Sequence, residues 1–282
     1  MDTQAIRHFY EAGHTSIKYA LGDVDIYGNV FHEWYELYLL MQGDVEYINS
    51  RARRSICPGQ LVIIPPGEYH QFLVLDNIQR YERCVIDIKP EFLPQDIPNS
   101  VLNTGGVLTL PAGHRILSDY RYLTECLTRT PNTDLFYILP ALATDIIFLL
   151  KNTAAAETLS SGNLRPASLR LIEYIDAHYT EPLPLAEIAR ECFLSVSSIC
   201  HLFREDFGIS IKKYILQKRM NGARLALLAG GSCNEVSISF GFSTYSEFYR
   251  AYRQYYGCAP SETDKQPANG SRRSVKRGKS DD

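Results

Sequence analysis

Hydrophobic positions recur with two different periods along this chain of 282 residues. Between residues 16 and 88, β-branched and aromatic residues form short runs that are separated by Gly, Asp-Asn and Pro-Gly. Many short strands at close spacing predict an all-β barrel or sandwich. From residue 108 onward the apolar residues recur every three or four positions, which is the period of an amphipathic helix. The pattern therefore predicts an α+β chain with a β-rich N-terminal part and a helical C-terminal part.

The stretch 108–151 predicts two antiparallel helices that cover the β-rich part. Each carries an apolar stripe, formed in the first helix by Ile116, Tyr120, Leu123 and Leu127 and in the second by Leu135, Ile138, Leu142, Ile146 and Leu149. These helices could pack on the β domain alone or also present a seam to a second copy of the chain, and we favour a homodimer. The apolar run 135–150 is too short for a membrane span and is interrupted by Pro140 and Asp145, so we interpret it as a buried helix.

Amino-acid composition predicts where the linker and the C-terminal tail begin and end. Residues 152–165 are small and polar, which is typical of a linker, and residues 262–282 contain few apolar residues, which predicts a disordered basic tail. The chain is therefore expected to consist of a β domain over 1–107, the helical pair over 108–151, the linker over 152–165, a helical domain over 166–261 and the tail over 262–282.

The helical domain contains nearly the same helix-turn-helix pattern twice, from Leu185 to Gly208 and from Asn234 to Gly257. Matching positions are Ile188, Ala189, Ser195, Ile199, Phe203, Arg204 and Gly208 in the first copy and Val236, Ser237, Thr244, Phe248, Tyr252, Arg253 and Gly257 in the second. The register slips by one residue, so the second turn is one residue longer. Two such units separated by one helix can place two helices in successive stretches of one DNA major groove.

Each copy has the residues that a helix-turn-helix needs. The second helix opens with an N-cap, Ser195 in the first copy and Ser243 or Thr244 in the second, and ends at a Gly that suits a left-handed C-cap. Polar residues opposite the buried stripe face outward, and we expect these to contact DNA: Ser197, Ser198, His201, Arg204, Ser246, Glu247, Tyr249, Arg250 and Arg253. The alternative is two helical hairpins of an ordinary all-α domain, which the matched register of the copies disfavours.

At these residues the chain resembles the AraC/XylS family of bacterial transcription regulators. The resemblance covers about 90 residues, from Leu171 to Pro260, and is carried by LAEIA, SVSSICHLFRE, FGISIKKYILQKRMNGARLALL and FGFSTYSEFYRAYRQYYGCAP. The chain departs from the family's usual residues at Ser237, Tyr252 and Arg253, where size or charge is roughly kept. The resemblance implies a regulator that binds double-stranded promoter DNA and carries a cupin-like sensor before its DNA-binding domain. RNA polymerase is a further candidate partner.

Residues 28–43 and 58–70 resemble the two halves of the cupin signature. The first half keeps His32 and Glu36, but Val30 stands where a cupin has its first metal-binding histidine. Alternation along a strand places one set of side chains on a single face, and the PPGEYH turn adds a histidine at the same mouth. We expect the effector to bind these residues: His32, Trp34, Glu36, Tyr38 and His70.

The chemistry of His32, Glu36 and His70 leaves two interpretations open. They could form a two-His, one-carboxylate site for iron(II) or manganese, or they could hydrogen-bond a polar organic ligand. We favour the organic ligand, because Trp34 beside the polar pair suits the apolar side of a sugar ring. No metal and no cofactor is therefore assigned, and the identity of the effector is left open.

Charge and cysteine content narrow the function. The formal net charge of −3 argues against a non-specific nucleic-acid binder, but residues 1–163 carry 12 Lys/Arg and 19 Asp/Glu whereas residues 164–261 carry 11 and 9. The positive excess thus lies with the DNA motif. Seven scattered cysteines without a C-x-x-C pair argue against disulfides and a zinc site and favour a cytoplasmic protein. The first residues are polar, so we expect no signal peptide.

These features predict a two-domain α+β transcription regulator. It is expected to bind a small-molecule effector in an N-terminal cupin-like β-barrel and DNA through a C-terminal all-α domain with two helix-turn-helix units, and to have no catalytic residues. The alternatives are a metal-dependent cupin enzyme fused to a DNA-binding domain, and a ligand-independent regulator controlled by a protein partner. Whether the protein activates or represses is left open.

Overall fold

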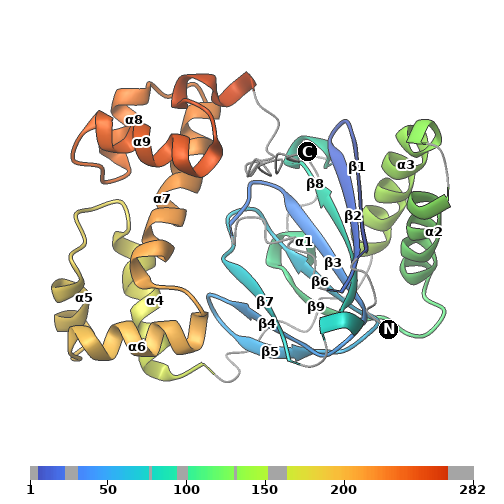
Figure 1. Cartoon of the computed structure of the whole chain (residues 1–282), viewed down its shortest axis with the longest axis horizontal. Helices are drawn as coiled ribbons and strands as arrows, with labels where there is room; N and C mark the ends of the chain where they lie inside the picture. Colours follow the sequence, from blue (N-terminus) through green and yellow to red (C-terminus); the bar gives the residue numbers. More distant parts are fainter. Residues whose placement is uncertain are drawn as a thin grey trace, which may run out of the picture.

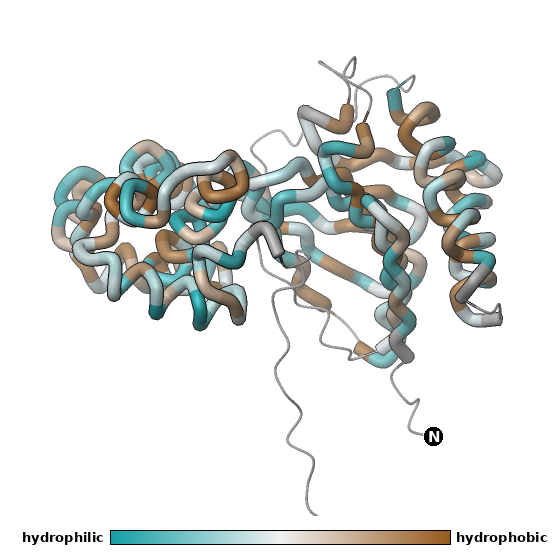
Figure 2. Tube along the Cα trace, turned by 90° about the horizontal axis from the view of Figure 1, so that it is seen from above, coloured by the Kyte–Doolittle hydropathy of each residue, from teal (hydrophilic) through white to brown (hydrophobic). Residues whose placement is uncertain are grey.

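The computed structural model describes residues 6–22, 31–75, 78–93, 101–129, 132–151 and 164–265. The helical C-terminal half lies on one side, two β-sheets lie in the middle, and a pair of helices lies on the far side (Figure 1). The view at right angles shows the same order (Figure 2). Residues 152–163 of the predicted linker (152–165), the part of the predicted tail beyond 265 and Val30 lie outside the described residues.

The described strands form two antiparallel sheets. They are β1 (Ile6–Ala12), β2 (Thr15–Leu21), β3 (Tyr35–Gln42), β4 (Val45–Asn49), β5 (Arg53–Ile56), β6 (Gln60–Ile64), β7 (His70–Val74), β8 (Glu82–Ile88) and β9 (Gly106–Thr109). The larger sheet has the order β1-β2-β8-β3-β6-β9 and the smaller one the order β5-β4-β7. The predicted β-rich N-terminal domain is thus confirmed. The described strands do not close into one continuous sheet, so a closed cupin-like barrel stays a prediction.

Strand β3 shows how alternation sorts side chains between two cores. Leu37 and Leu39 pack in a cluster with residues of the helical pair, whereas Tyr38 and Leu40 pack in a second cluster with residues of both sheets. Because side chains alternate across a strand, Glu36 shares a face with Tyr38 and points between the sheets. The larger sheet is therefore covered by helices on one face and by the smaller sheet on the other.

The helical pair covers the larger sheet as predicted. The short elements η1 (Ile78–Arg80), η2 (Pro90–Phe92) and α1 (Val101–Thr104) precede the two longer helices α2 (Arg115–Arg129) and α3 (Asn132–Lys151). In the predicted stripes, Ile116, Tyr120, Leu123, Leu135 and Ile146 are fully buried. The Tyr120 hydroxyl also donates a hydrogen bond of 2.7 Å to the Leu37 carbonyl oxygen of β3. None of the described helices has the length and apolar content needed to cross a membrane.

The predicted start of the helical pair at residue 108 is wrong. Leu108 lies in β9 and pairs with Leu61 of β6, and the first long helix begins only at Arg115. A strand of four residues is too short to produce a clear alternating pattern, and its pairing with β6 decides its conformation. Pro140 lies inside α3, which nevertheless continues to Lys151.

The C-terminal half is entirely helical where it is described. It consists of α4 (Pro166–His178), α5 (Leu185–Glu191), α6 (Val196–Phe207), α7 (Ile211–Leu228), α8 (Cys233–Ser239), α9 (Tyr245–Tyr256) and η3 (Pro260–Lys265). The predicted start of a disordered tail at residue 262 is wrong, because η3 continues to Lys265. Thr263 is buried there, and its hydroxyl shares a hydrogen bond of 2.8 Å with that of Tyr252.

Candidate DNA-binding surface and effector site

Helices α5 and α6 form one helix-turn-helix unit, helices α8 and α9 form the other, and α7 joins them. Ser195 caps α6 by accepting a hydrogen bond from the Ser198 amide, and Thr244 caps α9 by accepting one from the Glu247 amide. Gly208 and Gly257 end these helices with φ angles of 68° and 78°. The predicted caps are therefore present, and Thr244 rather than Ser243 is the cap of α9.

The two units bury the same positions. Ile199 and Phe203 of α6 are fully buried, as are Phe248 and Tyr252 of α9. Ala189 and its counterpart Ser237 are also buried, as expected where two helices pack closely. The connecting helix α7 has 18 residues and rises about 27 Å. That length is comparable with the 34 Å or so that separates successive major-groove segments on one side of B-DNA.

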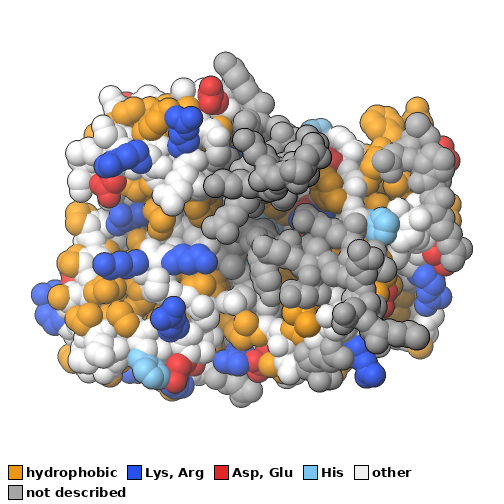
Figure 3. All heavy atoms as spheres, in the orientation of Figure 1, with side chains coloured by type: hydrophobic (Ala, Val, Ile, Leu, Met, Phe, Trp, Pro, Cys, Tyr) orange, Lys and Arg blue, Asp and Glu red, His pale blue; other side chains and the backbone are white. Residues whose placement is uncertain are grey.

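The residues expected to contact DNA lie on the outer faces of α6 and α9. Tyr249 is half-buried. The other eight are exposed: Ser197, Ser198, His201, Arg204, Ser246, Glu247, Arg250 and Arg253. Lys and Arg side chains are spread over the visible face of this half of the molecule (Figure 3). The surface is thus open to a polyanion.

Some of these residues already have local partners. The Glu247 carboxylate accepts a hydrogen bond of 3.2 Å from the Ser243 amide, so it also helps to cap α9. His201 Nδ1 lies 3.3 Å from a carboxylate oxygen of Glu205. Arg250 donates only a weak bond of 3.3 Å to the carbonyl of Ser246 in its own helix. Among the residues expected to contact bases, Arg250 therefore has more freedom to extend than Glu247.

Arg219 of α7 holds the second unit in place. Its guanidinium donates to the carbonyl oxygens of Tyr179 at 2.6 Å, Glu181 at 2.6 Å and Gly241 at 2.9 Å. These contacts join the chain after α4 to the turn between α8 and α9. Arg219 therefore serves the structure of the domain, although its position in the sequence motif alone did not show this.

The predicted effector residues of the N-terminal domain are brought together in part. His32, Glu36 and His70 are buried, and their potential ligand atoms all lie within 4.8 Å of one another. His32 Nε2 lies 3.4 Å and His70 Nε2 lies 3.7 Å from the two oxygens of Glu36. We call these three residues the polar cluster. Trp34 stacks on His32, with ring centroids 4.9 Å apart.

Tyr38 is not part of the polar cluster. It shares the face of β3 with Glu36, but its ring stacks on Phe72 at 3.8 Å and its hydroxyl hydrogen-bonds that of Tyr81 at 2.6 Å. The side chain is 1% exposed. Tyr38 therefore belongs to the core between the sheets, below the polar cluster, and its inclusion among the effector-binding residues is not supported.

The electrostatics of the polar cluster favour an anion beside a neutral imidazole. Burial alone would raise the pKa of the Glu36 carboxyl, but His32, His70 and Lys18 lower it to about 2. Burial lowers the pKa of His70 to about 4, against the attraction of Glu36. At neutral pH the cluster therefore combines a carboxylate with an uncharged His70.

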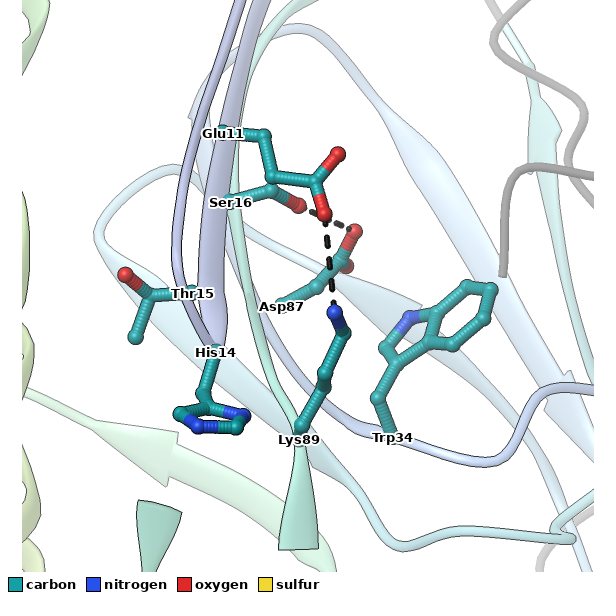
Figure 4. A pocket seen from close by; sticks show the side chains of 7 residues that line it. All are labelled: Glu11, His14, Thr15, Ser16, Trp34, Asp87 and Lys89. Atoms are coloured by element: carbon teal, nitrogen blue, oxygen red, sulfur yellow. Dashed lines mark hydrogen bonds and ion pairs between the residues drawn. The ribbon is translucent and has the colours of Figure 1, made fainter. Parts of the chain in front are cut away.

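A small cavity adjoins Trp34 beyond the polar cluster. It has a volume of about 30 Å³ and is lined by Glu11, His14, Thr15, Ser16, Trp34, Asp87 and Lys89 (Figure 4). Ser16 donates to Asp87 at 3.0 Å, and Lys89 lies 3.6 Å from Glu11. A cavity of this size holds about one water molecule.

Comparison with known proteins agrees with the geometry of the helical half. A family model described as a helix-turn-helix domain matches residues 188–266, which include most of both units. The virulence regulon transcriptional activator VirF of Yersinia enterocolitica is 24% identical over 258 residues, covering 84% of this chain and 91% of VirF. The chain is therefore similar to transcriptional regulators of the AraC family. The match marks the chain as a DNA-binding regulator of transcription.

Two further comparisons differ in extent. The Msm operon regulatory protein of Streptococcus mutans is 36% identical over 96 residues, or 34% of each chain. The crystal structure of ToxT from Vibrio cholerae covers 92% of this chain and 95% of ToxT at 14% identity, with a TM-score of 0.36. A TM-score this low does not establish a common fold over the whole chain.

The helical DNA-binding half packs directly on the β domain. Phe31 and Tyr69 lie against Tyr214 of α7, with ring centroids 5.5 Å and 5.2 Å away. The Tyr69 hydroxyl donates a hydrogen bond of 2.7 Å to the carbonyl of Phe207, the last residue of α6. All four aromatic residues are buried. We call these contacts, with the ion pair described next, the domain interface.

A buried ion pair completes the domain interface. Arg224 Nε of α7 lies 2.8 Å and 2.9 Å from the two carboxylate oxygens of Glu33. Arg224 is 4% exposed, and its guanidinium also lies over the ring of Tyr256, the last residue of α9, at 4.8 Å. Burial raises the pKa of Glu33, and Arg224 counteracts part of that rise. The β domain thus contacts the C-terminal end of α6 directly and that of α9 through Arg224.

The domain interface could not be predicted from the sequence. Glu33 and Arg224 are 191 positions apart, so no local pattern links them. A larger cavity of about 290 Å³ borders the interface, lined in part by Phe31, Arg51, Tyr214 and Lys218.

Proposed function

We propose that this AraC-family protein is a transcription regulator whose DNA binding responds to a ligand in the polar cluster. One observation supports the proposal above all: the residues of the polar cluster alternate along the chain with the residues of the domain interface. Phe31 and Glu33 contact the DNA-binding half, whereas His32, between them, belongs to the polar cluster.

The same alternation occurs in the second segment. Tyr69 contacts Phe207 and Tyr214, and His70, the next residue, belongs to the polar cluster. Gln71 follows, and its side-chain amide packs against Gly208, where an added Cβ would lie 2.9 Å from the Gln71 oxygen. A ligand that pulls His32 and His70 together must move the adjoining backbone. That movement reaches the ends of both second helices, α6 and α9.

The energetics of the domain interface suit a switch. Desolvating Glu33 and Arg224 costs free energy that their attraction largely offsets, so such a pair contributes little net stability while it remains sensitive to geometry. A displacement that separates the two charges inside the interface leaves each without a partner, which costs about 3–5 kcal/mol. A ligand needs only to bind one arrangement more tightly than the other to shift the equilibrium.

The relatives support activation as the mode of regulation. VirF is named a transcriptional activator, and we propose that this chain also activates transcription, by contacting RNA polymerase from a promoter site. A homodimer fits the outer side of the helical pair, because four aromatic side chains on it are at least half exposed: Tyr122, Phe136, Tyr137 and Phe148.

The test separates ligand binding from its transmission. Duplexes selected from a random pool by the full chain supply the DNA site, and a panel of sugars and other small metabolites is screened for a shift in unfolding temperature and in DNA affinity. Glu36→Ala and His70→Ala should abolish the response to the active compound while leaving basal DNA affinity nearly unchanged. Each lost polar partner costs the ligand about 1–3 kcal/mol.

Glu33→Gln tests the transmission itself. In this variant the ligand should still raise the unfolding temperature, because the polar cluster is intact. The ligand should no longer change DNA affinity, because the Glu33–Arg224 ion pair that links the β domain to α7 is lost. Glu82→Gln is the matched control, since Glu82 accepts a hydrogen bond from Tyr19 inside the β domain. If ligand-dependent DNA binding survives in Glu33→Gln, the signal does not pass through this interface. A response that survives in both cluster variants and is lost in Lys218→Ala would place the ligand in the larger cavity.

A further inference from the structure

We propose that Arg165 is a positioning residue for DNA binding, which neutralises Glu205 on the outer side of α6 and so lets this helix approach the phosphates of DNA. The inference goes beyond the proposed function, because it concerns how α6 binds DNA in the absence of any effector. Composition alone places Arg165 at the end of the linker, whereas the structure places it in the DNA-binding half. Leu164 beside it is buried in a cluster that includes residues of α4, α5 and α6.

Glu205 lies on the side of α6 that is expected to face DNA. It follows His201 by four residues, so the two share a side of the helix, and His201 Nδ1 lies 3.3 Å from its carboxylate. The side chain of Glu205 is 49% exposed. The major groove is about 12 Å wide, so a residue on the outer side of a helix inside it lies within roughly a Debye length, about 10 Å, of a phosphate. An unpaired carboxylate at this position would therefore repel DNA.

Arg165 supplies a positive charge at this position. Its guanidinium donates a hydrogen bond of 2.8 Å to Glu205 and two bonds of 2.6 Å and 3.0 Å to the two oxygens of Asp206. It also donates a bond of 3.3 Å to the Leu202 carbonyl oxygen of α6. Because Arg165 directly precedes α4, these bonds hold the carboxylate of Glu205 toward a neighbouring helix.

Asp206 has a different task from Glu205. It is 8% exposed, and the Ser168 hydroxyl of α4 also donates a hydrogen bond to it. Burial would raise the pKa of Asp206, but the hydrogen bonds from Arg165 and Ser168 lower it. A buried carboxylate with these partners fixes the guanidinium between α4 and α6. Glu205 is then the exposed carboxylate that the same guanidinium neutralises beside the DNA.

The second helix-turn-helix unit has no acid at the matching positions. Gln254 of α9 occupies the position of Glu205, and Tyr255 occupies that of Asp206. Gln254 is exposed and uncharged. Two acids in the last turn of α6 are also unfavourable for the helix dipole, which prefers cations at that end. The first unit therefore carries an electrostatic cost that the second does not, and Arg165 offsets it.

The affinity of the full chain for the selected DNA duplex, measured without any effector, tests the proposal. Arg165→Ala should weaken binding at least about fivefold at low salt and much less at high salt, because added ions screen the exposed carboxylate. Adding Glu205→Gln to this variant should restore most of the lost affinity. Arg165→Lys keeps the charge and should bind nearly as tightly as the wild type. Arg170→Ala is the matched control and should leave affinity nearly unchanged, because Arg170 is exposed on α4 outside these contacts.

A purely structural role of Arg165 predicts a different pattern. Asp206→Asn would then rescue Arg165→Ala better than Glu205→Gln does, and the loss of affinity would persist at high salt. Either result would overturn the proposal, as would equal weakening by Arg170→Ala. Circular dichroism checks that the variants fold; if Arg165→Ala does not, Arg165→Gln, which can still donate to Asp206, takes its place. No effector is present, so failure of the proposed ligand response leaves this inference standing, and the reverse also holds.

Discussion

At the scale of single residues, the structure separates side chains that share a face but differ in their task. On α9, Glu247 and Arg250 both point outward. Glu247 accepts a bond from the Ser243 amide and stabilises the start of the helix, whereas Arg250 is tied only weakly to the preceding turn. Outward orientation is a necessary condition for contact with DNA, and the local hydrogen bonds then decide which residue is free to make it.

Arg250→Ala should therefore weaken binding to the selected DNA site by about 1–3 kcal/mol and relax the preference at one base pair, because a guanidinium can donate two bonds to O6 and N7 of guanine. Competition assays with all four bases at each position measure this. Glu247→Gln is the control and should lower helix stability without changing base preference. If Arg250→Ala weakens binding to unrelated DNA equally, Arg250 contacts only phosphate.

At the scale of elements, the two helix-turn-helix units differ in their turns. Phe193 occupies the turn of the first unit with a φ of 57° and is 92% exposed. Gly241 occupies the matching position of the second with a φ of 73°. A Cβ on Gly241 would lie 2.6 Å from the carbonyl oxygen of Thr180. The first turn thus tolerates a strained side chain in open solvent, whereas the second has no room for one.

Phe193→Gly should raise the free energy of unfolding of the DNA-binding half by roughly 0.5–1 kcal/mol. The left-handed conformation costs a residue with a side chain about 1–2 kcal/mol, which exceeds the entropy cost of a glycine. Gly241→Ala is the opposite test and should destabilise by more than 1 kcal/mol or so, because strain and a clash with Thr180 coincide. Urea unfolding measures both, and an unchanged stability in Gly241→Ala would show that the second turn is free to rearrange.

The sequence predicted those elements whose signals are local. The caps at Ser195 and Gly208 were predictable because each is set by residues within one turn of the helix. Strand β9 was not, since its four residues adopt their conformation through pairing with β6. Side-chain alternation correctly placed Tyr38 on the same face of β3 as Glu36. It could not show that Phe72 and Tyr81 pack around Tyr38 and bury it in the core between the sheets.

At the scale of the whole molecule, the β domain lies between two surfaces with different tasks. The DNA-binding half packs on one side through Phe31, Glu33 and Tyr69, and the helical pair covers the opposite side of the larger sheet (Figure 1). The apolar stripes predicted from the sequence are buried against that sheet. The aromatic residues that remain exposed on α2 and α3 lie off those stripes, so they are available to a second copy without loss of the core.

Tyr137→Glu should therefore convert a dimer to a monomer. Tyr137 is 76% exposed, so the change should leave the unfolding temperature nearly unchanged. DNA affinity should fall by at least about tenfold, because two linked DNA-binding halves raise each other's effective concentration at a site with two half-sites. Phe9→Glu is the control, since Phe9 is a 42% exposed aromatic on β1, outside the helical pair. Sedimentation equilibrium measures the mass of each. If wild type and Tyr137→Glu are both monomers or both dimers over the same concentrations, the exposed face of α3 does not join two copies, and the dimer contact must be sought elsewhere on the chain.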